Sequence, residues 1–340
     1  MRNRVRNPPN RHDGLDVEWE VEPPKARLRI VEDHSAGVLT HNRSPDIDFD
    51  WSVNPYRGCT HACAYCYARR THEDLGYGAG SDFERVIVVK PRAPELLAEA
   101  LAKPRWKGER IAFSGVTDCY QPLERRYLLT RRCLATCARV RNPVTIVTRS
   151  PLVLRDLDVL AELHQVRAVG ITISVPVTNR VQQAALEPGA PPVDARFEAI
   201  ARLAQAGLPV GISIGPVIAG LNDRDIPRTL QRAREAGASW AWFGALRLPG
   251  AVRDVFERRL DEALPLAAPG IRAKIARTVT GSSAFHARSA GNRDDASWRA
   301  TEHLFRLWHT RLGYGPRWQP PVPSPFRRER APESQLALFG

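Results

Sequence analysis

The sequence predicts an α/β fold in which parallel strands alternate with helices. Short β-branched or apolar runs recur from Trp51 onward, and stretches with helical spacing separate them. Gly207 and Gly237 stand where two of these helices should end. Six such strand-and-helix units predict a parallel sheet with right-handed crossovers, either a curved partial barrel or an open doubly wound sheet.

The elements are expected in a regular order along the chain. Strands are expected near 51–56, 110–115, 144–148, 169–175, 209–215 and 239–246. Helices are expected near 124–140, 152–164, 194–206, 225–236 and 252–263. Asp194 and Asp223 are placed like N-terminal caps of two of these helices. In both candidate architectures, chemistry belongs at the carboxyl ends of the strands.

Composition divides the chain into four regions. Residues 1–50 are rich in Pro, Arg and acidic residues with little periodicity, which predicts an extension outside the core. The alternating pattern occupies 51–264, and a basic, aromatic region follows over 265–325. Residues 326–340 are expected to be a flexible tail, because the end of the chain is Pro-rich and extended.

Charge and cysteine content narrow the function classes. The 340 residues carry a formal net charge of +13, which favours polyanions such as nucleic acid, with a merely solvated surface as the alternative. Six cysteines are too few for a disulfide scaffold and indicate a reducing, cytoplasmic location. The sequence has no apolar run long enough for a membrane span, and its Arg-rich start lacks the apolar segment of a secretion signal.

The basic region has two interpretations. Residues 271–330 contain twelve Arg or Lys against four Asp or Glu. Aromatic residues are interleaved with this charge: Phe285, Trp298, Phe305, Trp308, Tyr314, Trp318 and Phe326. Aromatic rings in an electropositive groove could stack on single strands or flipped bases. Alternatively, Trp298, Phe305 and Trp308 fall at helical spacing and would form the core of a small helical cap.

Three thiols form the strongest motif. Cys59, Cys63 and Cys66 have C-x3-C-x2-C spacing after the first expected strand. Three thiolates on one tight loop can each bind one iron of a cubane and leave the fourth iron without a protein ligand. Gly58 would let the backbone turn closely around inorganic sulfide, and Arg57 would offset the cluster's negative charge.

The competing interpretation of these thiols is a structural zinc site, with His61 or His72 as fourth ligand. Such sites usually combine a C-x2-C pair with a distant second pair, and zinc has no reason to follow the first strand of an α/β repeat. Three unrelated buried thiols are a further alternative. The spacing therefore favours an iron–sulfur cluster.

With Tyr65 at the aromatic position, the loop resembles the C-x3-C-x-aromatic-C signature of the radical S-adenosylmethionine (SAM) superfamily. The resemblance covers about residues 51–250 and implies a partial (β/α)6 TIM-like barrel. It also implies a [4Fe-4S] cluster whose fourth iron is chelated by SAM. An electron from a reducing donor would then cleave SAM to a 5′-deoxyadenosyl radical that abstracts hydrogen.

The resemblance further implies cofactor-binding positions at the ends of later strands. Ser114, Gly115 and Thr117 follow the second strand, where the family binds the SAM amino group. Arg149 follows the third strand and Ser174 ends the fourth, at positions that meet the SAM carboxylate and ribose. Arginine suits a carboxylate because its fork can donate two parallel hydrogen bonds.

Within the superfamily, three stretches resemble the bacterial group related to spore photoproduct lyase, which reverses a thymine dimer in DNA. They are the Asn-Pro-Tyr-Arg-Gly-Cys run, the Thr-Asp-x-Tyr-Gln-Pro-x-Glu stretch and the Thr-Arg-Ser-x-Leu-x-x-Arg-Asp stretch, which begin at residues 54, 117 and 148. The lyase has a hydrogen-donating Cys in a Cys-Thr-Ser-Asp stretch, where this chain has Gly115-Val-Thr-Asp118. Cys119 is a candidate catalytic substitute, with a small buried Cys as the alternative. Cys133 and Cys137 are expected to be buried thiols on one helix face.

The C-terminal peptide resembles the bacterial sliding-clamp-binding motif Gln-Leu-x-Leu-Phe. Gln335 would hydrogen-bond at the edge of the clamp pocket, and Leu338 and Phe339 would fill it next to Leu336. Docking of this apolar peptide on its own domain is the alternative.

Together these features predict a radical SAM enzyme that acts on nucleic acid, in DNA repair. The expected partners are DNA, a reducing electron donor and a sliding clamp. Radical modification of RNA or protein is the alternative within the enzyme class. A non-catalytic zinc or iron–sulfur DNA-binding module is the alternative outside it.

Overall fold

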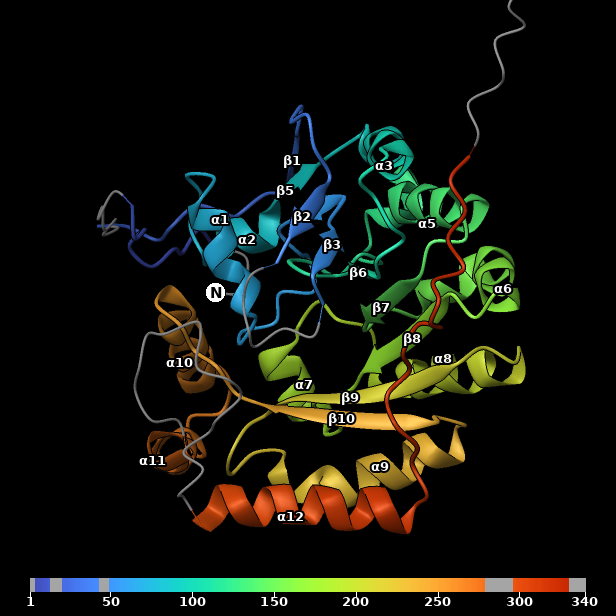
Figure 1. The fold of residues 1–340 in the computed structure, drawn as a ribbon. Helices are drawn as coiled ribbons and strands as arrows, with labels where there is room; N and C mark the ends of the chain where they lie inside the picture. Colours follow the sequence, from blue (N-terminus) through green and yellow to red (C-terminus); the bar gives the residue numbers. More distant parts are fainter. Residues whose placement is uncertain (1–3, 13–19, 43–48, 279–295, 330–340) are drawn as a thin grey trace, which may run out of the picture.

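A computed structural model describes residues 4–12, 20–42, 49–278 and 296–329 (Figure 1). The main sheet has the strand order β10-β9-β8-β7-β6-β3-β2. Its strands are β2 (Leu39–His41), β3 (Trp51–Val53), β6 (Ile111–Phe113), β7 (Val144–Thr148), β8 (Val169–Ser174), β9 (Val210–Val217) and β10 (Trp240–Ala245). Strands β3, β6, β7, β8, β9 and β10 are parallel and lie side by side in chain order, which confirms the predicted partial barrel.

A smaller sheet and an antiparallel edge strand come partly from the segment that was expected to be an extension. The small sheet has the order β1-β5-β4, with β1 (Arg29–Glu32), β4 (Tyr56–Arg57) and β5 (Val86–Val89). Strand β2 pairs antiparallel with β3 at the edge of the main sheet. Because β1 and β2 are short and largely exposed, they show no apolar alternation in the sequence.

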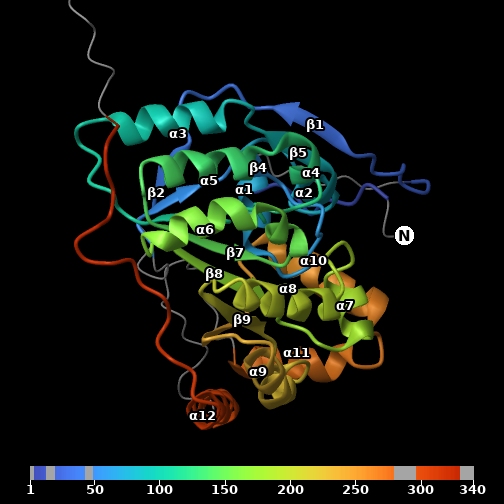
Figure 2. The same cartoon turned by 90° about the vertical axis from the view of Figure 1, so that its right-hand side faces the viewer.

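The helices lie mostly along one face of the main sheet. The α-helices are α1 (Arg70–Glu73), α2 (Ser81–Arg85), α3 (Ala93–Ala102), α4 (Glu124–Tyr127), α5 (Leu129–Arg139), α6 (Leu157–Gln165), α7 (Arg180–Leu186), α8 (Val193–Gln205), α9 (Ile226–Glu235), α10 (Ala251–Ala263), α11 (Ala268–Thr278) and α12 (Ala296–Arg311). Three 3-10 helices are η1 (Tyr67–Arg69), η2 (Pro151–Asp156) and η3 (Asp223–Asp225). Helices α3, α5, α6, α8 and α9 form a row on this face (Figure 2). Among the described helices, none is long and apolar enough to cross a bilayer.

Helix boundaries differ from the prediction at particular residues. The helix expected over 124–140 is divided into α4 and α5 at Leu128, which has a left-handed φ of 53°. Gly207 and Gly237 do follow α8 and α9, with φ of +73° and +97°, as a helix stop requires.

The two predicted aspartate caps are wrong. Asp194 lies inside the first turn of α8, and its carboxylate accepts hydrogen bonds from Arg180 and Arg232. Asp223 begins η3, and its side chain accepts from the backbone N–H of Gly220. Neither carboxylate therefore caps the helix that was expected to follow it.

Helix α12 decides between the two interpretations of the aromatic residues. Trp298 and Phe305 are 4% and 7% exposed, and both rings contact Phe243 of β10. Trp308 is partly buried against the same core. The helical-cap interpretation is therefore correct for these rings, and the base-stacking interpretation is wrong for them, because their faces are occupied by the core.

We call residues 315–329 the C-terminal strap, which is red in Figure 1. Its Gly315 N–H donates to Ser239 O, just before β10, and the Trp318 ring packs on Gly170 near the start of β8. Farther along, the Arg327 N–H donates to Val140 O at the end of α5. The strap therefore follows the amino ends of the strands and leaves their carboxyl ends uncovered. Gln335, Leu336, Leu338, Phe339 and Phe285 lie outside the described residues.

Candidate active site

The face of the sheet opposite the helices, which we call the inner face, carries small and polar residues. Apolar residues such as Ile146, Ile171 and Ile212 pack into the core shared with the helices. The residues that alternate with these apolar ones lie on the inner face. Across neighbouring strands they pair as Thr145 with Gly170, Ser52 with Ala112, Thr172 with Gly211 and Ser174 with Ser213. The Trp318 and Trp240 rings pack on Gly170 and Gly211, whereas the hydroxyls of Thr172, Ser174 and Ser213 can bind a polar ligand.

The loop that carries the three cysteines, residues 58–66, is fixed at its beginning. Gly58 has φ of +77°, and a Cβ there would lie 2.7 Å from Val86 O, so only glycine is compatible. The Gly58 carbonyl accepts hydrogen bonds from Thr117 Oγ1 at 2.7 Å and Gln121 Nε2 at 3.1 Å. The Cys59 N–H donates to Phe83 O at 2.9 Å. The loop is therefore tied to the segment that follows β6.

A buried arginine holds the loop from within. Arg69 is completely buried, and its Nε donates to the Cys63 carbonyl at 3.0 Å. Its other guanidinium nitrogens donate to the carbonyls of Ala79 and Gly80 and to Glu84 at 2.6 Å. Nothing in the local sequence distinguishes Arg69 from the other basic residues, so the sequence did not identify it.

The loop lies over the carboxyl ends of the later strands. Cys63, Ala64 and Tyr65 belong to one apolar cluster with residues that directly follow β8, β9 and β10, namely Val177, Ile218 and Leu246. The Ala64 N–H donates to Leu186 O at 2.8 Å. The cysteine loop therefore covers the end of the sheet where this architecture places its chemistry.

The Gly189→Ala variant tests this packing. The Gly189 N–H donates to His61 O at 3.1 Å, and a Cβ at position 189 would collide with the Thr60 carbonyl oxygen. Neither the new Cβ nor the Thr60 carbonyl oxygen can move away by rotation of a side chain, so the loop backbone must shift. We expect Gly189→Ala to lower the iron retained after reconstitution by about 10-fold, an effect comparable with loss of an outer-shell partner.

Gly270→Ala is the matched control, because a Cβ added at this position in α11 would have no atom within 4 Å. Iron and sulfide analysis of both purified variants gives the comparison. Equal iron content in Gly189→Ala and Gly270→Ala would contradict the close packing of the loop.

An ion pair links the cysteine loop to the end of β7. His61 Nδ1 lies 3.3 Å from Asp118 Oδ2, and both side chains are buried. Although burial opposes charge on both groups, the nearby Cys59 thiolate and the Asp118 carboxylate raise the pKa of His61 to about 10. Asp118 also accepts from Thr148 Oγ1 at 2.6 Å and from the Arg149 N–H at 2.8 Å, and its pKa is lowered to about 2.

A second buried network holds Tyr65. The Tyr65 hydroxyl donates to Glu187, whose carboxylate also binds Arg196 at 2.5 Å and Arg149 at 3.3 Å. Burial would raise the pKa of Glu187, but the two guanidinium groups hold it below its ordinary value. The network brings together Tyr65 and Arg149, both predicted for cofactor binding, through Glu187 and Arg196, which the sequence did not suggest.

The other predicted cofactor positions also lie at strand ends. Ser114 has an unusual φ of +81°, and its Oγ accepts from the Cys119 N–H at 3.0 Å. The Gly115 carbonyl accepts from the Tyr67 hydroxyl at 2.5 Å, and the Ser174 carbonyl accepts from Arg196. The structure therefore gathers Ser114, Gly115, Thr117, Arg149 and Ser174 at one end of the sheet, next to the cysteine loop.

The remaining cysteines are interior residues. Cys119, Cys133 and Cys137 are each 0% exposed and belong to the main apolar core. Burial raises the pKa of Cys119 well above its ordinary value, so the group stays a thiol. Of the two interpretations of Cys119, the structure favours a packed thiol over a residue that reaches substrate.

The cysteine loop was expected to hold a cluster, with a structural zinc ion as the alternative. Among the described residues, no group of three or more His, Cys, Asp or Glu side chains is arranged to hold one metal ion. A zinc site gathers all ligands around one atom, whereas a cubane takes each thiolate on a different iron. His72, a candidate zinc ligand, instead donates from Nε2 to Val86 O at 2.9 Å. Three thiols on one short loop are the donor set that a cubane takes, and His72 is not placed as a fourth zinc ligand.

His72 gives a pH-dependent prediction. Burial lowers the pKa of His72 to about 4, from its ordinary value of 6.5. The unfolded chain therefore binds this proton at higher pH than the folded chain does, and stability is lost as pH falls from 6.5 towards 4. We expect a loss of about 3 kcal/mol from this group in urea unfolding of the cluster-free protein.

The His72→Gln variant should lack this component, because Gln keeps a donor for Val86 O without the titration. His34→Gln, at an exposed position, is the control and should retain the wild-type pH dependence. If wild type and His72→Gln lost stability in parallel between pH 6.5 and pH 4, His72 would not be the group responsible.

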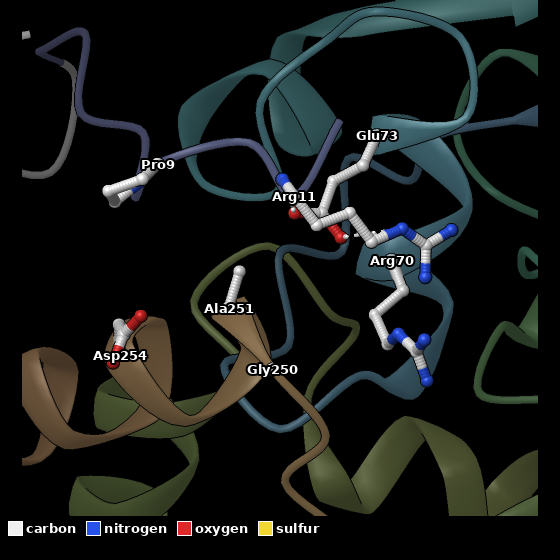
Figure 3. Close-up of a pocket in the computed structure, with 7 residues that line it drawn as sticks. All are labelled: Pro9, Arg11, Arg70, Glu73, Gly250, Ala251 and Asp254. Atoms are coloured by element: carbon white, nitrogen blue, oxygen red, sulfur yellow. Dashed lines mark hydrogen bonds and ion pairs between the residues drawn. The ribbon is translucent and has the colours of Figure 1, made fainter. Parts of the chain in front are cut away.

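A cavity of about 230 Å³ lies outside the loop, between the N-terminal segment, α1 and the start of α10 (Figure 3). It is lined by Pro9, Arg11, Arg70, Glu73, Gly250, Ala251 and Asp254. Arg11 and Arg70 extend side by side, and Arg11 lies 3.8 Å from the Glu73 carboxylate. Because both charge signs line it and no cysteine does, we do not assign the cofactor to this cavity.

Comparisons with known proteins identify the family. Residues 53–233 match the Radical SAM superfamily. An uncharacterized protein of Mycobacterium tuberculosis is 35% identical over 270 residues, which cover 74% of this chain and 79% of that protein. An uncharacterized protein of Methanocaldococcus jannaschii is 33% identical over 198 residues, covering 58% and 71% of the two chains.

Solved structures give the same fold. Spore photoproduct lyase complexed with dinucleoside spore photoproduct has a TM-score of 0.60 at 17% identity, covering 84% of this chain and 80% of that chain. A mutant of that lyase with bound AdoMet and dinucleoside spore photoproduct has a TM-score of 0.62 at 16% identity, with the same coverage. The chain belongs to the radical SAM superfamily and is a radical SAM enzyme.

Proposed function

We propose that this enzyme abstracts hydrogen from nucleic acid, in a DNA-repair reaction related to that of spore photoproduct lyase. The observation that carries the proposal is a cysteine loop over the carboxyl ends of the strands, above an inner face of small polar residues. The formal net charge of +13 supports a polyanionic substrate. The fold shared with the lyase over 84% of the chain supports the same substrate class.

In this proposal, Cys59, Cys63 and Cys66 hold a [4Fe-4S] cluster. Ser114, Gly115, Thr117, Arg149 and Ser174 bind SAM at the neighbouring strand ends. With the cluster and SAM both bound, an electron from an external donor would allow them to supply the one-electron chemistry that abstracts hydrogen. Such a cluster needs a reducing compartment, and so do the six free thiols, which supports a cytoplasmic location.

The protein contributes positioning and exclusion of water. Arg69 and the Gly58 contacts fix the loop, and the Glu187 network orients Arg149, whose guanidinium suits the SAM carboxylate. Burial of Cys59 and Cys63 keeps bulk water from the reacting region. Because position 115 is glycine, no thiol is available there to return hydrogen to the substrate, so we propose a reaction related to photoproduct repair rather than that repair itself.

The test measures SAM cleavage in the reconstituted enzyme with defined probes. UV-irradiated DNA, the same DNA without irradiation, RNA of the same sequence and a polyanionic peptide are added separately. We expect irradiated DNA to increase 5′-deoxyadenosine formation most, and the increase to fall steeply with salt because phosphate contacts release counterions. An increase with RNA or the peptide alone would overturn the DNA assignment and favour the alternative modification chemistry.

A further inference from the structure

Trp242 of β10 points to the inner face of the sheet. The strand register pairs Trp242 with Ser213 and its neighbour Trp240 with Gly211. Phe243, the next residue, points to the other face and contacts Phe305 of α12 at a ring distance of 4.3 Å. Since successive side chains of a strand alternate, Trp242 shares its face with the small residues above which the cysteine loop lies.

The distal edge of the indole lies beside two glycines. A Cβ added at Gly215 would be 3.5 Å from Cζ3 of Trp242 and 3.6 Å from Cη2, and one at Gly244 would be 3.5 Å from Cζ3. Both glycines lie nearer the carboxyl ends of their strands than Ser213 and Trp242 do. Gly215, Gly244 and Trp242 are partly exposed, whereas Ser213 is buried. Trp242 is therefore partly exposed, and its distal edge is directed toward the carboxyl ends of β9 and β10.

The polar atom of this ring has no protein partner. Trp242 Nε1 is buried and makes no hydrogen bond to any described residue. A buried indole N–H usually finds an acceptor, because leaving it unpaired is costly. Trp240 Nε1, on the same strand, is also buried without a hydrogen-bond partner, so protein atoms cover both indole nitrogens.

Positive charge accompanies the ring. The guanidinium carbon of Arg317, in the C-terminal strap, lies 5.4 Å from the centroid of the Trp242 ring. This cation–π contact places positive charge beside an aromatic surface. A flat, partly exposed ring with adjacent positive charge matches a nucleobase on a phosphodiester strand, which offers a π-face and negative charge.

We propose that Trp242 is the base-stacking residue of the substrate site. A base of the nucleic acid stacks on the partly exposed indole, next to the Arg317 guanidinium. This inference rests on the proposed nucleic-acid substrate and adds the residue that contacts the base. The adenine of SAM is the other planar group that could occupy this position, and the experiment separates the two.

The experiment compares Trp242→Ala and Trp242→Phe with wild type in the reconstituted enzyme. The probes are a short labelled oligothymidylate and an abasic strand of the same length and charge, followed by fluorescence anisotropy. Trp242→Ala should weaken oligothymidylate binding by about 10-fold, in the range measured for loss of one stacked base. It should leave abasic-strand binding unchanged. Trp242→Phe should retain most of the preference for the strand that has bases.

Trp308→Ala is the matched control. Trp308 also has a guanidinium over its ring, that of Arg311 at 4.9 Å, but it lies on α12 outside the sheet. The control should bind both strands like wild type. Equilibrium dialysis with SAM accompanies each variant, and SAM affinity should not change in Trp242→Ala.

Each outcome decides the proposal. The proposal is overturned if Trp242→Ala keeps the wild-type preference for the strand with bases. It is also overturned if the variant selectively loses SAM affinity, because the ring would then belong to the cofactor site. If wild type bound neither strand, the nucleic-acid substrate itself would be wrong and this inference would fail with it. If Trp242→Ala does not fold, Trp242→Phe still tests the stacking through its retained base preference.

Discussion

Replacing any one of Cys59, Cys63 and Cys66 with Ala is expected to abolish the cluster and reduce SAM cleavage by more than about 100-fold. A cubane that loses one thiolate loses a protein ligand to one of its irons. Iron and sulfide content, the cluster's visible absorption and 5′-deoxyadenosine formation measure the effect. The three variants should behave alike.

Cys133→Ala and Cys137→Ala are the controls for thiol chemistry in general. Both residues are free, fully buried thiols on α5, away from the loop. They should retain wild-type iron content even where some stability is lost through the smaller side chain. A loop variant with full iron content, or a core variant without iron, would place the cluster elsewhere.

Arg69→Met is expected to have the second-largest effect. The variant leaves the Glu84 carboxylate and three carbonyl groups in the interior without the guanidinium that binds them. Removing one partner of a buried ion pair typically costs about 3–5 kcal/mol. Because Arg259 still lies 3.3 Å from Glu84, we expect the lower end of this range, about 3 kcal/mol.

Arg69→Met should also lose iron more rapidly than wild type on chelator challenge, because the Cys63 carbonyl is released. Urea unfolding of the cluster-free protein and the rate of iron loss measure the two effects. Arg306→Met is the control: its ion pair with Glu302 is on the surface of α12, so the expected change is below about 1 kcal/mol. Equal stability of the two variants would refute a structural role for Arg69.

The main sheet could be predicted from the sequence, because its strands have a strong local signal. Strands β7, β8 and β9 are rich in β-branched and apolar residues, which alternate in β8 and β9 with small or polar ones. Strands β1 and β2 could not, since they are short, exposed and held by partners distant in sequence. The cap positions failed for a related reason: Asp194 finds two arginines that only the folded chain brings close.

The candidate site was predictable only where its residues are close in sequence. The three cysteines are recognisable by their spacing alone. Tyr65 and Glu187 are 122 positions apart, so their contact arises from the fold and has no sequence signal. Arg69 is one of fifty Lys or Arg residues, and its burial depends on α2 closing over the loop. The aromatic residues of α12 show the same limit, because helical spacing was compatible with both of their interpretations.

The most direct measurement is SAM cleavage under anaerobic conditions. The protein is reconstituted with iron and sulfide, SAM and dithionite are added, and 5′-deoxyadenosine is quantified beside a Cys66→Ala control. Formation of 5′-deoxyadenosine by wild type alone is the predicted result and would establish a reducible cluster on the 58–66 loop that cleaves SAM. Stoichiometric zinc in place of iron, with no 5′-deoxyadenosine from either protein, would contradict the account.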